Sequence, residues 1–152
     1  MLNARRCAEI TAVVLLLAGM AGASFAQDAA GAIAARQAFM KGVTPMVTAI
    51  TTAAGKGDMA GAKAAAKTLD DGWKTFAASF PAGSDSAAGK TRAKPEIWSD
   101  AAGFKAEMDK ALASSSAILA ETNGTDADAV IQTAGYLNCT SCHSTYRGPA
   151  VR

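Results

Sequence analysis

Cys139 and Cys142 are separated by two residues near the end of this 152-residue chain, and His143, its only histidine, follows at once. The remaining cysteine, Cys7, lies within the first ten residues. Two thiols and an imidazole within five consecutive residues come from one turn of chain, so that they can serve a single bound group. The sequence therefore predicts that the functional centre is built by the C-terminal segment.

The N-terminal segment has the pattern of a secretory signal. Arg5 and Arg6 give it a positive start, residues 10–20 are apolar and uncharged, and Ser24-Phe25-Ala26 supplies small residues where the signal peptidase cuts. We expect residues 1–26 to be removed with Cys7, leaving residues 27–152 as one exported domain without a membrane span. The alternative, an uncleaved membrane anchor, needs nearly twice this apolar length. The expected location is the bacterial periplasm.

On an exported chain, the spacing of Cys139, Cys142 and His143 is the attachment pattern of haem c. Each thiol adds to one vinyl group of the porphyrin, and the histidine next to the second thiol then lies beneath the iron. A zinc site needs a fourth Cys or His that the mature chain lacks, although a carboxylate can substitute. A thioredoxin-like pair needs neighbouring strands, and a short disulfide is the simplest alternative. We predict haem c, with its iron, as the cofactor.

The composition favours closely packed helices. Half of the residues are hydrophobic but only 6% are aromatic, so small side chains must fill much of the core, and a large β-sandwich is disfavoured. The formal net charge is +2, with both signs interspersed, which argues against nucleic acid as a partner.

Apolar residues recur at helical spacing through the mature chain. A first helix is predicted over residues 28–54, with Pro45 either kinking it or restarting it at Thr44. A second helix is expected from the Asp58 cap to Phe80, and residues 81–95 form a long loop.

A third helix is predicted from Pro95 to Asn123-Gly124. A fourth begins at the Asp126 cap and runs through the cysteine motif to Gly148-Pro149. The expected fold class is all-α, an antiparallel four-helix bundle with covalently bound haem c in its core. The chain without haem is expected to be loose or unfolded, because so small a domain buries only about two thirds of its surface.

At this point the sequence resembles the cytochrome c′ family, the class II c-type cytochromes, which attach haem near the C-terminus. The resemblance covers essentially the whole mature chain. Four groups of residues carry it: Arg36-Gln37 with Met40; Phe80-Pro81 before Gly83-Ser84-Asp85; the run from Lys94 to Asp100 with Phe104-Lys105; and Cys139 to His143 with Arg147.

The resemblance implies a role for each matching residue. Cys139 and Cys142 match the thioether cysteines, and His143 matches the proximal iron ligand. Arg147 matches an arginine near that histidine, although a cation there also suits the end of a helix. In the first helix, Arg36 matches an arginine that approaches a haem propionate, with Gln37 beside it in the cofactor-binding set. The alternative for Arg36 is a solvated surface charge.

Met40 matches the distal position of the family, and whether it ligates the iron decides between two functions. If its thioether ligates the iron, the protein is a six-coordinate carrier of single electrons between redox partner proteins. If Met40 only lines an apolar pocket, the iron is five-coordinate and binds gases such as nitric oxide or carbon monoxide. The residues around Met40 favour ligation. An enzyme of peroxidase type is disfavoured because no second histidine is available. Alanine-rich faces on the first two helices permit a homodimer.

Overall fold

The computed structural model describes the backbone of residues 4–150 and the side chains of residues 28–150. Within that part, the regular elements are helices, joined by one isolated antiparallel bridge between Ala93 and Arg147. The predicted all-α fold class is confirmed.

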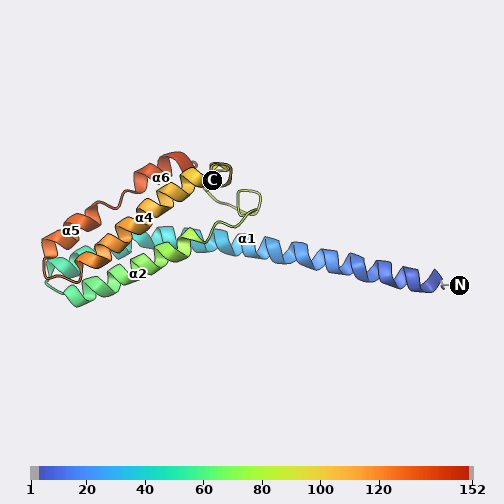
Figure 1. Cartoon of the computed structure of the whole chain (residues 1–152), viewed down its shortest axis with the longest axis horizontal. Helices are drawn as coiled ribbons and strands as arrows, with labels where there is room; N and C mark the ends of the chain where they lie inside the picture. Colours follow the sequence, from blue (N-terminus) through green and yellow to red (C-terminus); the bar gives the residue numbers. More distant parts are fainter. Residues whose placement is uncertain (1–3, 151–152) are drawn as a thin grey trace.

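Helix α1 runs over Ala4–Gly55 and contains Pro45 in its interior. Of the two alternatives at Pro45, a restart at Thr44 is therefore excluded, since the helix continues through the proline. Its N-terminal part extends away from the other helices (Figure 1) and includes most of the predicted signal; residues 1–3 of that segment lie outside the described residues. Cleavage before Gln27 stays a prediction.

Helix α2 covers Met59–Ala77 and begins at the predicted cap, where the Asp58 side chain accepts a hydrogen bond from the amide of Gly61 at 2.8 Å. It ends three residues before Phe80. The amide and the hydroxyl of Ser79 both donate to the carbonyl of Phe76, at 3.0 and 2.6 Å, which turns the chain out of the helix. The predicted end at Phe80 was therefore too late.

The predicted third helix is divided into α3, Glu96–Ser99, and α4, Ala101–Glu121. Asp100 lies between them with a non-helical ψ of 57°, and its side chain accepts from the amide of Gly103 at 3.1 Å. An aspartate that caps a helix in this way must itself leave helical geometry. Prediction of one continuous helix from Pro95 was wrong for this reason.

The predicted fourth helix is also divided, into α5, Ala127–Gly135, and α6, Cys139–Tyr146. Asp126 caps α5 as predicted, and Asn138 caps α6 through its side-chain oxygen. The cysteine motif therefore opens a short helix of its own.

Helices α1, α2, α4 and α5 form the four-helix body. Both α1 and α4 pack against α2 and against α5, which gives a closed ring of four contacts (Figure 1). Helix α6 instead packs against α3 and α4. No helix in the described part of the chain combines the length and the apolar character needed to cross a membrane.

Aromatic rings join the helices of the body in a continuous series. Phe39 of α1 packs edge-on against Trp73 of α2, with ring centroids 5.1 Å apart. Phe104 of α4 contacts Tyr146 of α6 in the same manner at 5.2 Å. Phe76 and Phe80 lie between these pairs and connect α2 with α4. Such edge-to-face contacts add to the stability that burial gives, and they fix how the helices are placed around the site.

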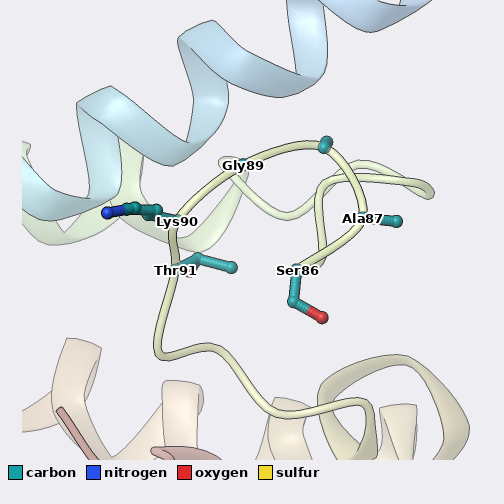
Figure 2. Close-up of a pocket in the computed structure, with 6 residues that line it drawn as sticks. Ser86, Ala87, Gly89, Lys90 and Thr91 are labelled. Carbon is teal, nitrogen blue, oxygen red and sulfur yellow. The ribbon is translucent and has the colours of Figure 1, made fainter. Parts of the chain in front are cut away.

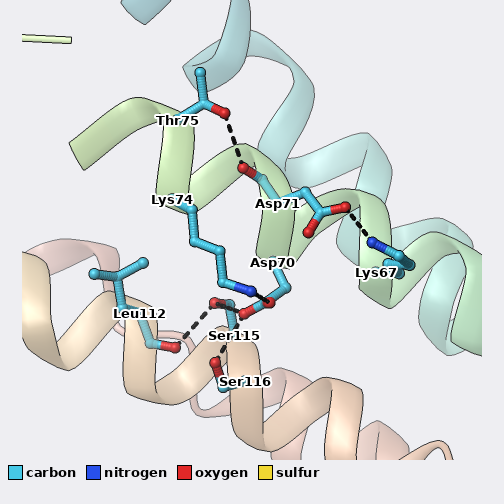
Figure 3. A network of polar contacts seen from close by, with 8 residues as sticks. All are labelled: Lys67, Asp70, Asp71, Lys74, Thr75, Leu112, Ser115 and Ser116. Carbon is cyan, nitrogen blue, oxygen red and sulfur yellow. Dashed lines mark hydrogen bonds and ion pairs between the residues drawn. The ribbon is translucent and has the colours of Figure 1, made fainter. Parts of the chain in front are cut away.

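A buried carboxylate holds α2 to α4 (Figure 3). The side chain of Asp70, 2% exposed, accepts from the hydroxyls of Ser115 and Ser116 at 2.8 and 2.9 Å, and it pairs with Lys74 at 2.6 Å. Burial alone would raise the pKa of Asp70, but these hydrogen bonds and the lysine charge hold it below its usual value. Both oxygens of the buried Asp70 carboxylate thus have partners.

Candidate functional site

The cysteine motif occupies the first turn of α6. The side-chain oxygen of Asn138 accepts from the amides of Thr140 at 3.0 Å and Ser141 at 3.4 Å, which fixes where the helix starts. From Cys139, the second cysteine is three residues on and His143 is four, so their side chains lie on one side of the helix. Both thiols are free, with Cys139 exposed and Cys142 half-buried. The alternative of a disulfide between them is therefore not what the structure has.

The carboxylate of Glu107 on α4 accepts a hydrogen bond from the cysteine motif. Ser141, between the two cysteines, donates to Oε2 of Glu107 at 2.7 Å, and Lys110 pairs with Oε1 at 2.6 Å. Hydrogen bonds from Lys110 and Ser141 lower the pKa of Glu107. Burial, followed by the charge of Glu107, raises the pKa of Cys142. Glu107 thus positions α6 on α4 while keeping its charge paired.

The end of α6 is anchored by a buried phenol. The hydroxyl of Tyr146 donates to Oδ2 of Asp100 at 2.7 Å, and this hydrogen bond together with burial raises the pKa of Tyr146 to about 12. Asp100 therefore serves two elements, because its other oxygen caps α4.

Residues 92–94 of the long loop run antiparallel to the segment that follows α6. The amide of Gly148 donates to the carbonyl of Arg92 at 2.7 Å, and Nε of Arg92 donates to the carbonyl of Gly148 at 2.8 Å. Lys94 donates from its amide to Tyr146 at 3.1 Å and from Nζ to Thr145 at 2.7 Å, in both cases to the carbonyl. The loop thereby fixes the C-terminal side of the motif.

His143 is half-buried and has two arginines near it. Burial lowers the pKa of the imidazole, and the positive charges of Arg147 and Arg92 lower it further. Arg147 is exposed and follows the last residue of α6 with an extended backbone, so the predicted helix does not continue through it; its role near a haem stays a prediction. Arg92 had not been predicted at the site.

Arg36, predicted to approach a haem propionate, donates hydrogen bonds to the long loop. Its guanidinium is buried and donates to the carbonyl of Ser79 at 2.7 Å and to the hydroxyl and carbonyl of Ser84 at 2.8 and 2.6 Å. It also lies 4.7 Å from the ring centre of Phe80, and burial lowers its pKa. The alternative of a solvated surface charge does not fit a residue that is 4% exposed.

Gln37 also ties α1 to the loop, since its Nε2 donates to the carbonyl of Lys90 at 2.7 Å. The loop forms a shallow open hollow at this point, lined by Ser86, Ala87, Ala88, Gly89, Lys90 and Thr91 (Figure 2). The one charged side chain among these lining residues is that of Lys90, and the rest are small. The long loop therefore joins α1 at one end of its course to the segment behind α6 at the other.

Met40 is half-buried on α1 and packs against the hydrophobic core. Helix α6, which carries His143, packs on α3 and α4. It does not pack closely on α1, the helix of Met40. A flat group attached to α6 and facing α1 is compatible with this arrangement.

These residues fit a covalently attached haem. Two free thiols and an imidazole lie on one side of α6, and the donor set, one nitrogen and two sulfurs, suits thioether attachment with a single histidine ligand. Across the described residues, no three His, Cys, Asp or Glu side chains gather into a site for a metal ion, so the zinc alternative lacks its further donors.

Sequence reasoning missed Arg92, Glu107 and Asn138. Asn138 had a readable signal, because asparagine directly before a helical segment is a common cap. Arg92 and Glu107 had none, since one lies in a loop without periodicity and the other on a polar helix face.

The comparisons with known proteins agree with this site. The family model described as Cytochrome C′ matches residues 31–147. A cytochrome c-556 from Agrobacterium fabrum is 34% identical over 144 residues, covering 91% of this chain and 93% of the relative. A cytochrome c′ from Rhodopseudomonas palustris is 32% identical and covers 93% and 95% of the two chains.

Among solved structures, cytochrome c′ from Rubrivivax gelatinosus superposes with a TM-score of 0.67 at 29% identity, covering 76% of this chain and 94% of that chain. A nitric oxide complex of a cytochrome c prime variant from Alcaligenes xylosoxidans gives 0.69 at 25% identity and covers 80% and 97%. The predicted resemblance is confirmed: this chain belongs to the cytochrome c′ family, whose cofactor is haem c with its iron.

Proposed function

We propose that this cytochrome is an exported carrier of single electrons in which Cys139 and Cys142 hold haem c and in which His143 and Met40 ligate its iron. The observation that carries the proposal is the position of Met40, half-buried in the apolar face of α1 rather than in solvent.

When bound, the haem supplies an iron that exchanges one electron. The residues of the chain determine how that exchange proceeds. His143 would hold the iron through an imidazole nitrogen, and Met40 would hold it through its soft thioether, which would favour the ferrous state. Phe39 and Val43, next to Met40 on α1, pack against the core and keep its surroundings apolar. With both ligands supplied by the protein, little rearrangement would accompany electron transfer.

The second candidate function is gas binding, in which Met40 lines the distal side without ligating. It is favoured by the nitric oxide complexes among the structural relatives. In neither function does the chain catalyse a reaction, since both need only the iron and its ligands.

The visible spectrum of the reduced protein separates the two functions. A sharp, split α/β pair that carbon monoxide leaves unchanged supports ligation by Met40. A broad band that shifts strongly with carbon monoxide contradicts it. Met40→Ala should convert the first spectrum into the second. Met46→Ala is the matched control, because Met46 is also half-buried on α1, and it should leave the spectrum unchanged.

The same proposal places the mature protein in the periplasm, with redox proteins as its partners. Intact mass of protein from the periplasmic fraction should correspond to a chain that begins at Gln27 and carries one haem. A chain that retains residues 1–26 would contradict the export step. A homodimer is tested by sedimentation of the same material.

A further inference from the structure

Two hydrogen bonds join α6 to carboxylates of α4 and of its cap, one on each side of His143 in the sequence. Near the start of α6, Ser141 donates to Oε2 of Glu107 at 2.7 Å. At the end of α6, Tyr146 donates to Oδ2 of Asp100 at 2.7 Å. The earlier residue of α6 pairs with the later residue of α4, so the two helices run antiparallel here. Helix α6 is therefore fixed on α4 at two points, and His143 lies between them.

Each of the two carboxylates is held in place by a second partner. Oε1 of Glu107 pairs with Lys110 at 2.6 Å. Oδ1 of Asp100 accepts from the amide of Gly103 at 3.1 Å. Neither carboxylate can turn toward another donor without losing a contact on its own helix. A carboxylate fixed in this way gives the hydroxyl that it binds one defined position.

Helix α4 leaves room for the phenol of Tyr146. A Cβ atom at Gly103 would lie 2.5 Å from the phenol oxygen, which is closer than a Cβ atom can approach. The ring of Tyr146 is buried and packs edge-on against Phe104, with ring centroids 5.2 Å apart. The hydroxyl can approach α4 this closely because residue 103 has no side chain. The end of α6 thus fits one place on α4.

We propose that Asp100 and Glu107 are positioning residues for His143, because together they fix where α6 lies on α4. The inference rests on the proposed ligation of iron by His143. An imidazole on a helix that is held at two points has one orientation toward the iron, whereas on a helix held at one point it has a range of orientations. Neither carboxylate needs to contact the imidazole for this role.

A purely structural role makes a different prediction. If the two hydrogen bonds only add stability, their loss should lower the unfolding temperature and leave the orientation of the imidazole as it is. If they set that orientation, their loss should change the EPR spectrum of the ferric protein. The spectrum reports the plane of an axial imidazole in both functions considered for Met40, through the g values of low-spin iron or the rhombic splitting of high-spin iron.

The test records EPR spectra of the purified ferric holoprotein for Ser141→Ala, Tyr146→Phe and the double variant. Tyr146→Phe keeps the ring that packs on Phe104 and removes only the donor. Ser141→Thr keeps a hydroxyl and should behave as the wild type. We expect the double variant to show a shifted spectrum or a second set of signals, and each single variant to show a smaller change.

Ser116→Ala is the matched control, because it also removes a hydroxyl on α4 from a carboxylate, that of Asp70 on α2 at 2.9 Å, without involving α6. It should leave the EPR spectrum unchanged. An unchanged spectrum in the double variant, or the same change in Ser116→Ala, would overturn the inference.

Two further measurements separate this inference from the proposed function. Pulsed EPR of the wild type detects couplings from an imidazole nitrogen bound to iron, and their absence would overturn ligation by His143 and the inference with it. Haem mass on the peptide with Cys139 and Cys142 is recorded for each variant. Loss of haem in a variant alone would show that its hydrogen bond acts in attachment rather than in orientation, which would also overturn the inference.

Discussion

The α2–α4 contact and the α6 side of the molecule treat their charged groups in opposite ways. Between α2 and α4, the carboxylate of Asp70 is buried and each of its oxygens has a partner (Figure 3). Around α6, two thiols are free, and the charges of Arg147 and Arg92 lower the pKa of His143 after burial does.

The difference separates the part that maintains the fold from the part that serves the cofactor. Buried polar groups that are fully partnered specify how helices pair, and they gain nothing from a further ligand. The free thiols of α6 instead remain available to a bound group. Four substitutions test this division, each with a counterpart from the same chain.

The largest effect is expected from the thiols. The double variant Cys139→Ala, Cys142→Ala should lose all covalent haem, because no other thiol remains in the predicted mature chain. Denaturing mass spectrometry of protein made in a host that matures c-type cytochromes measures this. Cys7→Ala is the control and should leave the haem in place. Covalent haem on the double variant would contradict the assignment of the attachment site to α6.

Asp70→Ala should be the most destabilising change in the α2–α4 contact, by about 3 kcal/mol, because it removes a buried carboxylate from three partners. Asp71→Ala is the control, since the side chain of Asp71 is 54% exposed and pairs with Lys67; it should cost at most about 0.5 kcal/mol. Denaturant unfolding of the holoprotein measures both.

The contribution of Asp70 should also depend on pH in a defined direction. Its pKa is lower in the folded chain than the ordinary value of about 3.9. The stability that it provides is therefore present above about pH 4 and is lost as the pH falls through the folded value. The stability difference between wild type and Asp70→Ala should shrink on acidification. A constant difference would mean that the carboxylate charge contributes nothing.

Arg36→Ala should destabilise the protein by about 2 kcal/mol, because it leaves the buried carbonyl of Ser84 without its donor. The loop should also become more sensitive to limited proteolysis. Gln37→Ala removes one exposed hydrogen bond from the same loop and should have a smaller effect. Equal effects of the two variants would show that Arg36 does not hold the loop in the folded protein.

The smallest effects are expected from the helix caps, one on each side of the comparison. Asp58→Ala in the body and Asn138→Ala before the cysteine motif should each cost about 1 kcal/mol. Thermal unfolding followed at the haem absorption band compares them. A much larger cost for Asn138→Ala would show that the start of α6 supports more than its own first turn.

The sequence was sufficient for the helical class, the two caps Asp58 and Asp126 and the residues of the attachment motif. These features are local, since a cap acts within one turn and the motif within five residues. Asp100 and Asn138 were not recognised as breaks because each lies within a helical pattern of apolar residues. At such positions tertiary contacts determine where a helix ends, and the hydrogen bond from Tyr146 to Asp100 is one of them.

The site was predictable to the same limited extent. Helical spacing from His143 did not predict the place of Arg147, which follows α6 with an extended backbone, and the family resemblance indicated Arg36, Gln37 and Met40. The hydrogen bonds from Arg36 to Ser79 and Ser84 were not predictable, because the course of a long loop depends on contacts between residues far apart in sequence.

The position of α6 also has a consequence for biosynthesis. It is the most C-terminal helix among the described residues, and α1, α2, α4 and α5 pack on one another without contacts from it. Helix α6 is held to that body chiefly through Tyr146, Ser141 and the carbonyls bound by Lys94. Contacts this few can open locally at a small cost in free energy. To reach both thiols, a haem-attaching enzyme therefore needs to displace α6 alone from its neighbours.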